Sequence, residues 1–156
     1  AIARIFLYAA FIEPYWQRMA SSTDATLAAI AAKAHKEAAY HLRYSGEWMI
    51  RLGDGTDESH RRAQQALDEL WPYSGELFTA SAAEVVLMQK GIAIDPTTLR
   101  ESWRAVVTRV LSEATLTMPA EGWMHTGGRE GKHSEHLGVM LAEFQSLARS
   151  HPGATW

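Results

Sequence analysis

One uninterrupted stretch with helical periodicity, residues 24–52, constrains the fold more than any other feature of the chain. Ser22, Thr23 and Asp24 offer N-cap oxygens before it, and the glycine-rich turn that starts at Gly53 ends it. The apolar and small residues fall on one helical stripe about 120° wide. They are Leu27, Ile30, Ala31, Ala34, Ala38, His41, Leu42, Ser45, Trp48, Met49 and Leu52. This pattern predicts a long amphipathic helix that packs against other helices.

The opposite face of this helix is charged and carries Lys36, Arg43 and Glu47. The four-residue spacing also predicts surface ion pairs of Lys33 with Glu37 and of Glu47 with Arg51.

Residues 1–20 are apolar nearly all round, with Glu13 as the only carboxylate and Pro14 as an expected kink or break. A helix that is apolar on every side must be covered on every side, so it lies inside a bundle or against another chain. The segment starts within a helical pattern and without a cap. We therefore expect that an N-terminal part is missing from this sequence.

Further helices follow, and no segment alternates like a strand. We expect one at 58–78, kinked near Trp71 by Pro72, and a short one opened by a capping box at Ser81–Glu84. Another begins after Asp95-Pro96, and a last one begins near Ser134. Residues 115–132 lack periodicity, and so long a loop is usually functional or bound by a partner. The sequence predicts one all-α domain over residues 1–156.

The composition excludes several classes of function. The net charge is −3 and no basic stripe is present, which argues against nucleic acid as a partner. The absence of cysteine removes disulfides and thiolate metal sites and fits a reducing compartment. No apolar run approaches the roughly 20 residues of a membrane-spanning helix.

Glu37 and His41 are the first candidate site. Di-iron carboxylate bundles use glutamate and histidine three residues apart on an inward helix face. Here the spacing is four, and Tyr40 stands where the ligand histidine would be. A carboxylate that orients a half-buried imidazole explains the pair without a metal. The alternative is a metal site made by Glu13, Glu37 and His41.

A second candidate lies between the irregular loop and the last helix. His133 and His136 are three residues apart, but a helix N-terminus disfavours cations, so capping and packing is the preferred interpretation. The glycine-rich run before them could hold a phosphate through backbone N–H groups, Arg129 and Lys132. Because no Walker pattern is present, an interface loop is the simpler interpretation. His35 and His60 are lone histidines, and Trp16, Trp48, Trp71 and Trp103 are core or interface anchors.

Several long motifs, taken together and in order, resemble one family. They are residues 36–44, 51–56, 70–78 (Leu-Trp-Pro-Tyr-Ser-Gly-Glu-Leu-Phe), 127–138 and 152–156. They are similar to the C subunits of ring 1,2-phenylacetyl-CoA epoxidase, the PaaC family of bacterial phenylacetate degradation. The match reaches the C-terminus and corresponds to the larger, C-terminal part of the family's sequence.

The resemblance implies a ferritin-like helical bundle in the cytosol. It also implies a non-catalytic structural subunit without a metal or cofactor of its own, for which Glu37 and His41 are the remnant of a ligand position, now a polar core pair. The partner would be a homologous catalytic A subunit that carries the di-iron centre. The complex would draw electrons from a reductase to epoxidise the aromatic ring.

Three functional hypotheses follow. The preferred one is a scaffold subunit in a hetero-oligomer, which forms a homodimer when its partner is absent. The second is an oxygenase or oxidase that binds metal itself through Glu13, Glu37 and His41. The third is recognition of coenzyme A, or of a partner, at the loop and helix start that hold Arg129, Lys132, His133 and His136.

Overall fold

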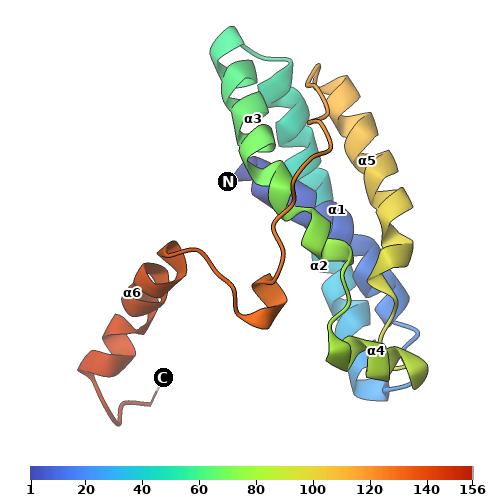
Figure 1. The fold of residues 1–156 in the computed structure, drawn as a ribbon, viewed down its shortest axis with the longest axis vertical. Helices are drawn as coiled ribbons and strands as arrows, with labels where there is room; N and C mark the ends of the chain where they lie inside the picture. The colour runs from blue at the N-terminus through green and yellow to red at the C-terminus, as the bar shows by residue number, and fades with distance from the viewer. Residues whose placement is uncertain (156) are drawn as a thin grey trace. The chain divides into compact units, whose positions relative to one another are not determined.

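The computed structural model describes residues 1–155, and their regular structure is entirely helical (Figure 1). The predicted all-α class is therefore confirmed. The α-helices are α1 (Ile2–Met19), α2 (Ala25–Gly53), α3 (Asp57–Leu70), α4 (Ala82–Gln89), α5 (Arg100–Glu113) and α6 (His136–Ser150). Short 3₁₀ helices lie at η1 (Trp71–Tyr73), η2 (Gly75–Phe78), η3 (Pro96–Leu99) and η4 (Gly128–Glu130).

The chain divides into two compact units, residues 1–125 and 126–156. The described part of the second unit holds one α-helix, and about 40 residues is the usual lower limit for a chain that folds alone. The division therefore does not establish a second domain, and the single domain stays a prediction.

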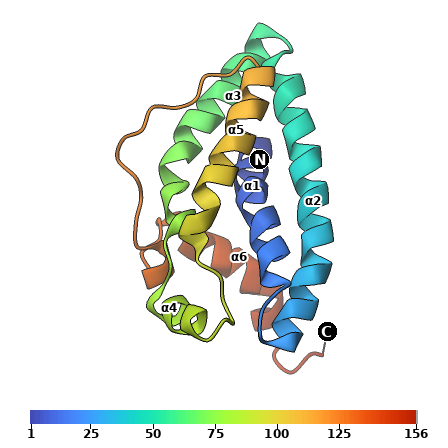
Figure 2. The ribbon, with the colours of Figure 1, turned by 90° about the vertical axis from the view of Figure 1, so that its right-hand side faces the viewer.

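The core of residues 1–125 forms where α1 packs against α2, with α3 and α5 closing over them (Figure 2). Phe6, Leu67, Leu99 and Val107 are fully buried there. The indole Nε1 of Trp103 donates a hydrogen bond to the carbonyl of Leu7 at 2.9 Å. This bond ties α5 to α1, because a buried indole N–H needs an acceptor.

Side-chain caps begin several helices as the sequence predicts. The carboxylate of Asp24 accepts from the backbone N–H groups of Thr26 and Leu27, both at 2.9 Å, at the start of α2. Ser81 and Glu84 form the expected capping box of α4. These caps satisfy N–H groups that would otherwise lack a partner within the helix.

The helix expected at 58–78 is shorter in the structure. It ends at Leu70, and the chain continues through η1 and η2. Pro72 has no N–H to continue the α-helical ladder, and its ring fits the start of a new turn, so it ends the helix rather than kinking it.

The last helix, α6, starts at His136, two residues later than expected, and none of its residues is buried. Its apolar side chains are exposed, including Val139, Met140, Leu141, Phe144 and Leu147. Among the described residues, no helix combines the length and apolar character of a membrane span.

A close approach between α2 and the end of α5 requires glycine at position 53. A Cβ built on Gly53 would lie 2.2 Å from the carbonyl oxygen of Ala114, which is backbone and cannot swing aside. A Cβ on Gly46, in the same helix, would meet Val110 Cγ2 at an ordinary 3.8 Å.

We therefore expect Gly53→Ala to lower the free energy of unfolding by about 3 kcal/mol, through the overpacking it forces. The matched variant Gly46→Ala should be neutral or stabilising by up to about 1 kcal/mol, because alanine favours a helix. Urea denaturation followed by circular dichroism measures both. Equal stability of the two variants would contradict this account of the α2–α5 contact.

Candidate functional site

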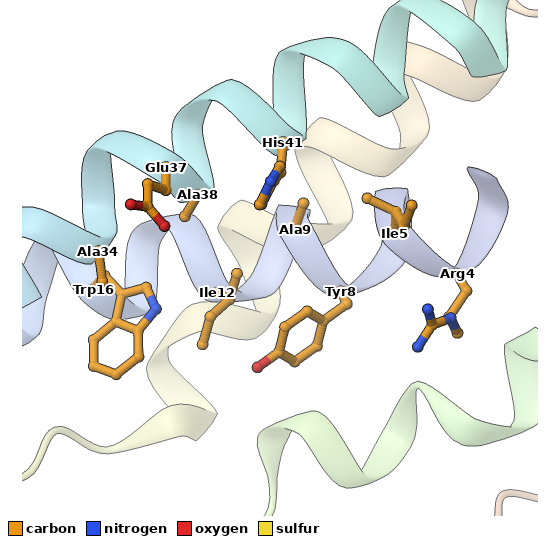
Figure 3. A pocket seen from close by; sticks show the side chains of 10 residues that line it. All are labelled: Arg4, Ile5, Tyr8, Ala9, Ile12, Trp16, Ala34, Glu37, Ala38 and His41. Carbon is orange, nitrogen blue, oxygen red and sulfur yellow. The ribbon is translucent and has the colours of Figure 1, made fainter. Parts of the chain in front are cut away.

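A groove along the α1–α2 seam has a volume of about 520 Å³ (Figure 3). Its lining comes from these two helices only: Arg4, Ile5, Tyr8, Ala9, Ile12, Trp16, Ala34, Glu37, Ala38 and His41. Most of these side chains are apolar. The polar groups are few, and Figure 3 shows Arg4 toward one end of the groove and Glu37 toward the other. Such a surface suits another apolar element better than a small polar ligand.

Glu37 and His41 both line this groove, so the structure does bring the first candidate pair to one surface. Both side chains are exposed, and no hydrogen bond joins them in the part of the chain that is described. We expected Glu37 and His41 to form a polar pair in the core, but the structure leaves both side chains exposed. Glu37 and His41 are exposed because they lie at the edge of the apolar stripe of α2, where α1 is the only other helix that lines the groove.

Glu13 does not join them. Its carboxylate Oε1 lies 2.7 Å from the ring Nε2 of His35, with 22% and 31% of the two side chains exposed. His35 precedes Glu37 by two positions, about 200° around the helix, so the two point to different sides of α2. Glu13 lines a second groove of about 500 Å³ with Arg109 and residues of α2.

The ligand set of the metal-binding hypothesis is therefore not assembled by these residues. Within residues 1–155, no three histidine, aspartate or glutamate side chains come together as a metal would need. The donors that a di-iron bundle uses converge from several helices on one inward point. Glu13, Glu37 and His41 instead belong to two different grooves and do not fit such a centre.

Sequence reasoning missed the Glu13–His35 contact because the residues lie 22 positions apart on different helices. Taken singly, Glu13 suits a snorkelling or capping group and His35 suits a structural histidine. The other lone histidine, His60, also has a partner: its Nδ1 lies 2.7 Å from the carbonyl of Gly53.

In the second candidate site, which lies within residues 126–155, the glycine-rich run forms a closed turn. Gly127 and Gly131 have φ values of 89° and 86° and flank η4. The backbone N–H groups of Glu130 and Lys132 both donate to the carbonyl of Gly127, at 2.9 Å. Because these amides are used within the turn, they do not form a phosphate cradle. Phosphate binding here would rest on the side chains of Arg129 and Lys132.

His133 precedes α6, and His136 is its first residue; both are exposed. No side chain caps this helix start. The capping role expected for His133 is thus not formed by a side-chain hydrogen bond. Recognition of coenzyme A or of a partner at this segment stays a prediction.

An aromatic cluster that the sequence analysis did not foresee fastens the irregular segment to η1. The rings of Tyr73 and His125 stack at 4.0 Å with 8° between their planes, and Trp123 meets His125 edge-on at 4.3 Å. The N–H of His125 donates to the carbonyl of Pro72 at 2.8 Å. Residues near 125 are therefore held in place, although they form no regular element.

Two carboxyl groups outside both grooves have altered acidity. The guanidinium groups of Arg61 and Arg62 donate hydrogen bonds to Glu58 and lower the pKa of that carboxyl. The hydroxyl and the backbone N–H of Thr97 lower the pKa of Asp95 in the same way. Both groups stabilise helix starts, as N-terminal carboxylates do, and neither marks a catalytic centre.

We expect the Glu13–His35 contact to contribute about 0.5–1 kcal/mol to stability, because both groups are partly shielded from water. A double-mutant cycle with Glu13→Gln and His35→Ala, measured by urea unfolding, gives this coupling. A parallel cycle on the exposed Glu58–Arg62 pair is the control and should give a smaller coupling. A Glu13–His35 coupling indistinguishable from zero would show that the contact does not fasten α1 to α2.

Comparison with known proteins identifies the family. The family model described as phenylacetic acid catabolic protein (PaaA_PaaC) matches residues 1–156. The chain is 49% identical over 155 residues to the C subunit of 1,2-phenylacetyl-CoA epoxidase from Escherichia coli (strain K12). The alignment covers 99% of this chain but 62% of that relative, so the chain spans less than two thirds of its length. Both findings confirm the resemblance carried by the sequence motifs, and the chain belongs to the PaaA_PaaC family of phenylacetic acid catabolic proteins, whose members are ferritin-like helical bundles.

Proposed function

We propose that this chain is a structural, non-catalytic subunit of a multicomponent oxygenase that epoxidises the ring of phenylacetyl-CoA. The observation that carries the proposal is the 49% identity to the C subunit of the Escherichia coli epoxidase over nearly the whole chain. In the proposed complex, a homologous catalytic subunit holds the di-iron centre and the substrate, and a reductase supplies electrons. The assembly acts in the cytoplasm.

The arrangement of the candidate ligands supports this proposal. Glu13 is engaged by His35, and Glu37 and His41 lie on another groove. Tyr40 occupies the position that would complete a glutamate–histidine pair three residues apart, and it lies on an exposed face of α2. The Tyr40 ring contacts the rings of His41 and Tyr44 and does not lie in a cluster of acidic side chains.

The surface of the chain supports a role in assembly. The α1–α2 groove is lined mostly by apolar side chains, and Tyr8 within it is 52% exposed. Contiguous apolar surface of this kind marks interaction sites in soluble proteins. A scaffold subunit needs such surfaces, whereas the alternative, an oxygenase that binds metal through Glu13, Glu37 and His41, needs those side chains to converge.

Reconstitution distinguishes the two functions. The epoxidase reaction should require this chain together with the catalytic subunit and the reductase, and the double variant Glu37→Ala/His41→Ala should retain activity within about twofold of the unchanged protein. The control variant Glu101→Ala removes an exposed carboxylate from α5 and should behave in the same way. Activity and bound iron lost together in the Glu37/His41 variant, with assembly intact, would favour the metal-binding alternative.

A further inference from the structure

The chain after α5 runs back across the bundle without forming a regular element. We call residues 117–125 the strap, and Figure 2 shows this segment leaving the end of α5 and passing α3. Within residues 1–155, no backbone N–H from residue 118 to residue 124 donates to another backbone carbonyl. The strap is therefore held by its two ends and by side-chain contacts, and has no hydrogen-bond ladder of its own.

The first end of the strap is held firmly. Gln64 of α3 grips the backbone of Thr117 in both directions, because its Oε1 accepts from the N–H at 2.8 Å and its Nε2 donates to the carbonyl at 3.0 Å. The neighbouring Leu116 is 7% exposed, and its N–H donates to the carbonyl of Leu111 at 2.9 Å. Buried side chains and paired backbone groups resist local opening. We call this end the pivot.

The middle of the strap is open to water. Residues 120–123 are all exposed, and a Cβ built on Gly122 would meet no atom within 4 Å. The ion pair of Arg104 with Glu121 crosses this part, but the two side chains are 61% and 71% exposed, and pairs of this kind contribute little to stability. Movement of the middle would therefore take no buried group into water.

The far end of the strap is held by the aromatic cluster on η1. Tyr73, which stacks on His125, is 52% exposed, and Trp123 is 72% exposed. Beside these rings, the strap is held by the bond from the His125 N–H to the carbonyl of Pro72 and by the half-buried Met124. Contacts that water reaches this easily belong to the low end of the range of local stability in a folded protein.

The two ends thus differ in strength, and the weaker one carries the rest of the chain. His125 is the last residue of the first unit, so its anchorage fixes the point from which residues 126–156 continue. We propose that Tyr73, Trp123 and His125 form a latch that opens while the pivot at Gln64 and the helical core stay closed.

Opening the latch changes the tether of the second unit. With the latch closed, residues 126–156 continue from η1. With the latch open, they continue from a free arm that reaches up to about 27 Å from Thr117, since eight further residues can extend. The latch therefore sets the reach of the unit that carries α6 and its exposed apolar side chains. This inference goes beyond the proposed function and does not depend on it, because the latch and the pivot lie within residues 1–125.

Amide hydrogen exchange, measured by NMR on the intact chain, distinguishes the two ends. Tyr73→Ala removes the stacked ring and should speed exchange of the His125 amide about tenfold, while the Thr117 amide stays within about twofold. The matched control Tyr73→Phe keeps a ring that can stack and should leave both amides within about twofold of the unchanged protein. Gln64→Ala should do the reverse of Tyr73→Ala and speed exchange at Thr117 about tenfold, but not at His125.

Spin labels measure the release itself. The chain has no cysteine, so Lys36→Cys and Gly122→Cys, both at exposed positions, can be labelled specifically. Pulsed electron paramagnetic resonance should give one narrow distance distribution for this labelled pair. Adding Tyr73→Ala should produce a broad second population, whereas adding Tyr73→Phe should not.

Two results would overturn the inference. One is faster exchange at Thr117 and His125 alike in Tyr73→Ala, because the strap and the core would then open together. The other is a distance distribution that stays the same when the Tyr73 ring is removed. Circular dichroism checks that each variant keeps its helices. If Tyr73→Ala does not fold, Trp123→Ala removes a more exposed ring of the same latch and should show the same two effects.

Discussion

The close packing of α1 against α2 is the contact on which the rest of the structure depends. It is possible because small residues line the seam on both helices: Ala9, Ala10, Ala31 and Ala38 are at most 4% exposed. With the backbones this close, α3 and α5 cover one side of the pair, and Trp103 reaches from α5 to the carbonyl of Leu7. The groove with Glu37 and His41 lies along the same two helices.

This seam also explains why the candidate polar residues do not form one site. Helical geometry sends His35 and Glu37 to different sides of α2, so Glu13 pairs with the first and remains apart from the second. The same helix thus places Glu37 and His41 in one groove and leaves His35 to contact Glu13.

Structural features that depend on one short segment of the chain were predictable from the sequence. The cap at Asp24, the capping box at Ser81 and the helical class all appear as predicted, because each depends on residues within a few positions. The contacts of Glu13 with His35 and of Tyr73 with His125 were not predictable, since they join residues that meet only after the helices pack. The prediction that Glu37 and His41 are buried was wrong for a related reason. Periodicity assigns residues to one face of a helix, but it does not show how far other helices pack over that face.

The most direct test of the scaffold account is the iron content of the purified chain, measured by elemental analysis alone and in complex with the catalytic subunit. The account predicts no stoichiometric iron in the chain alone, and in the complex only the amount found in the catalytic subunit by itself. One or two irons bound per chain, lost on Glu37→Ala, would contradict it and make this chain a metal-binding oxygenase subunit.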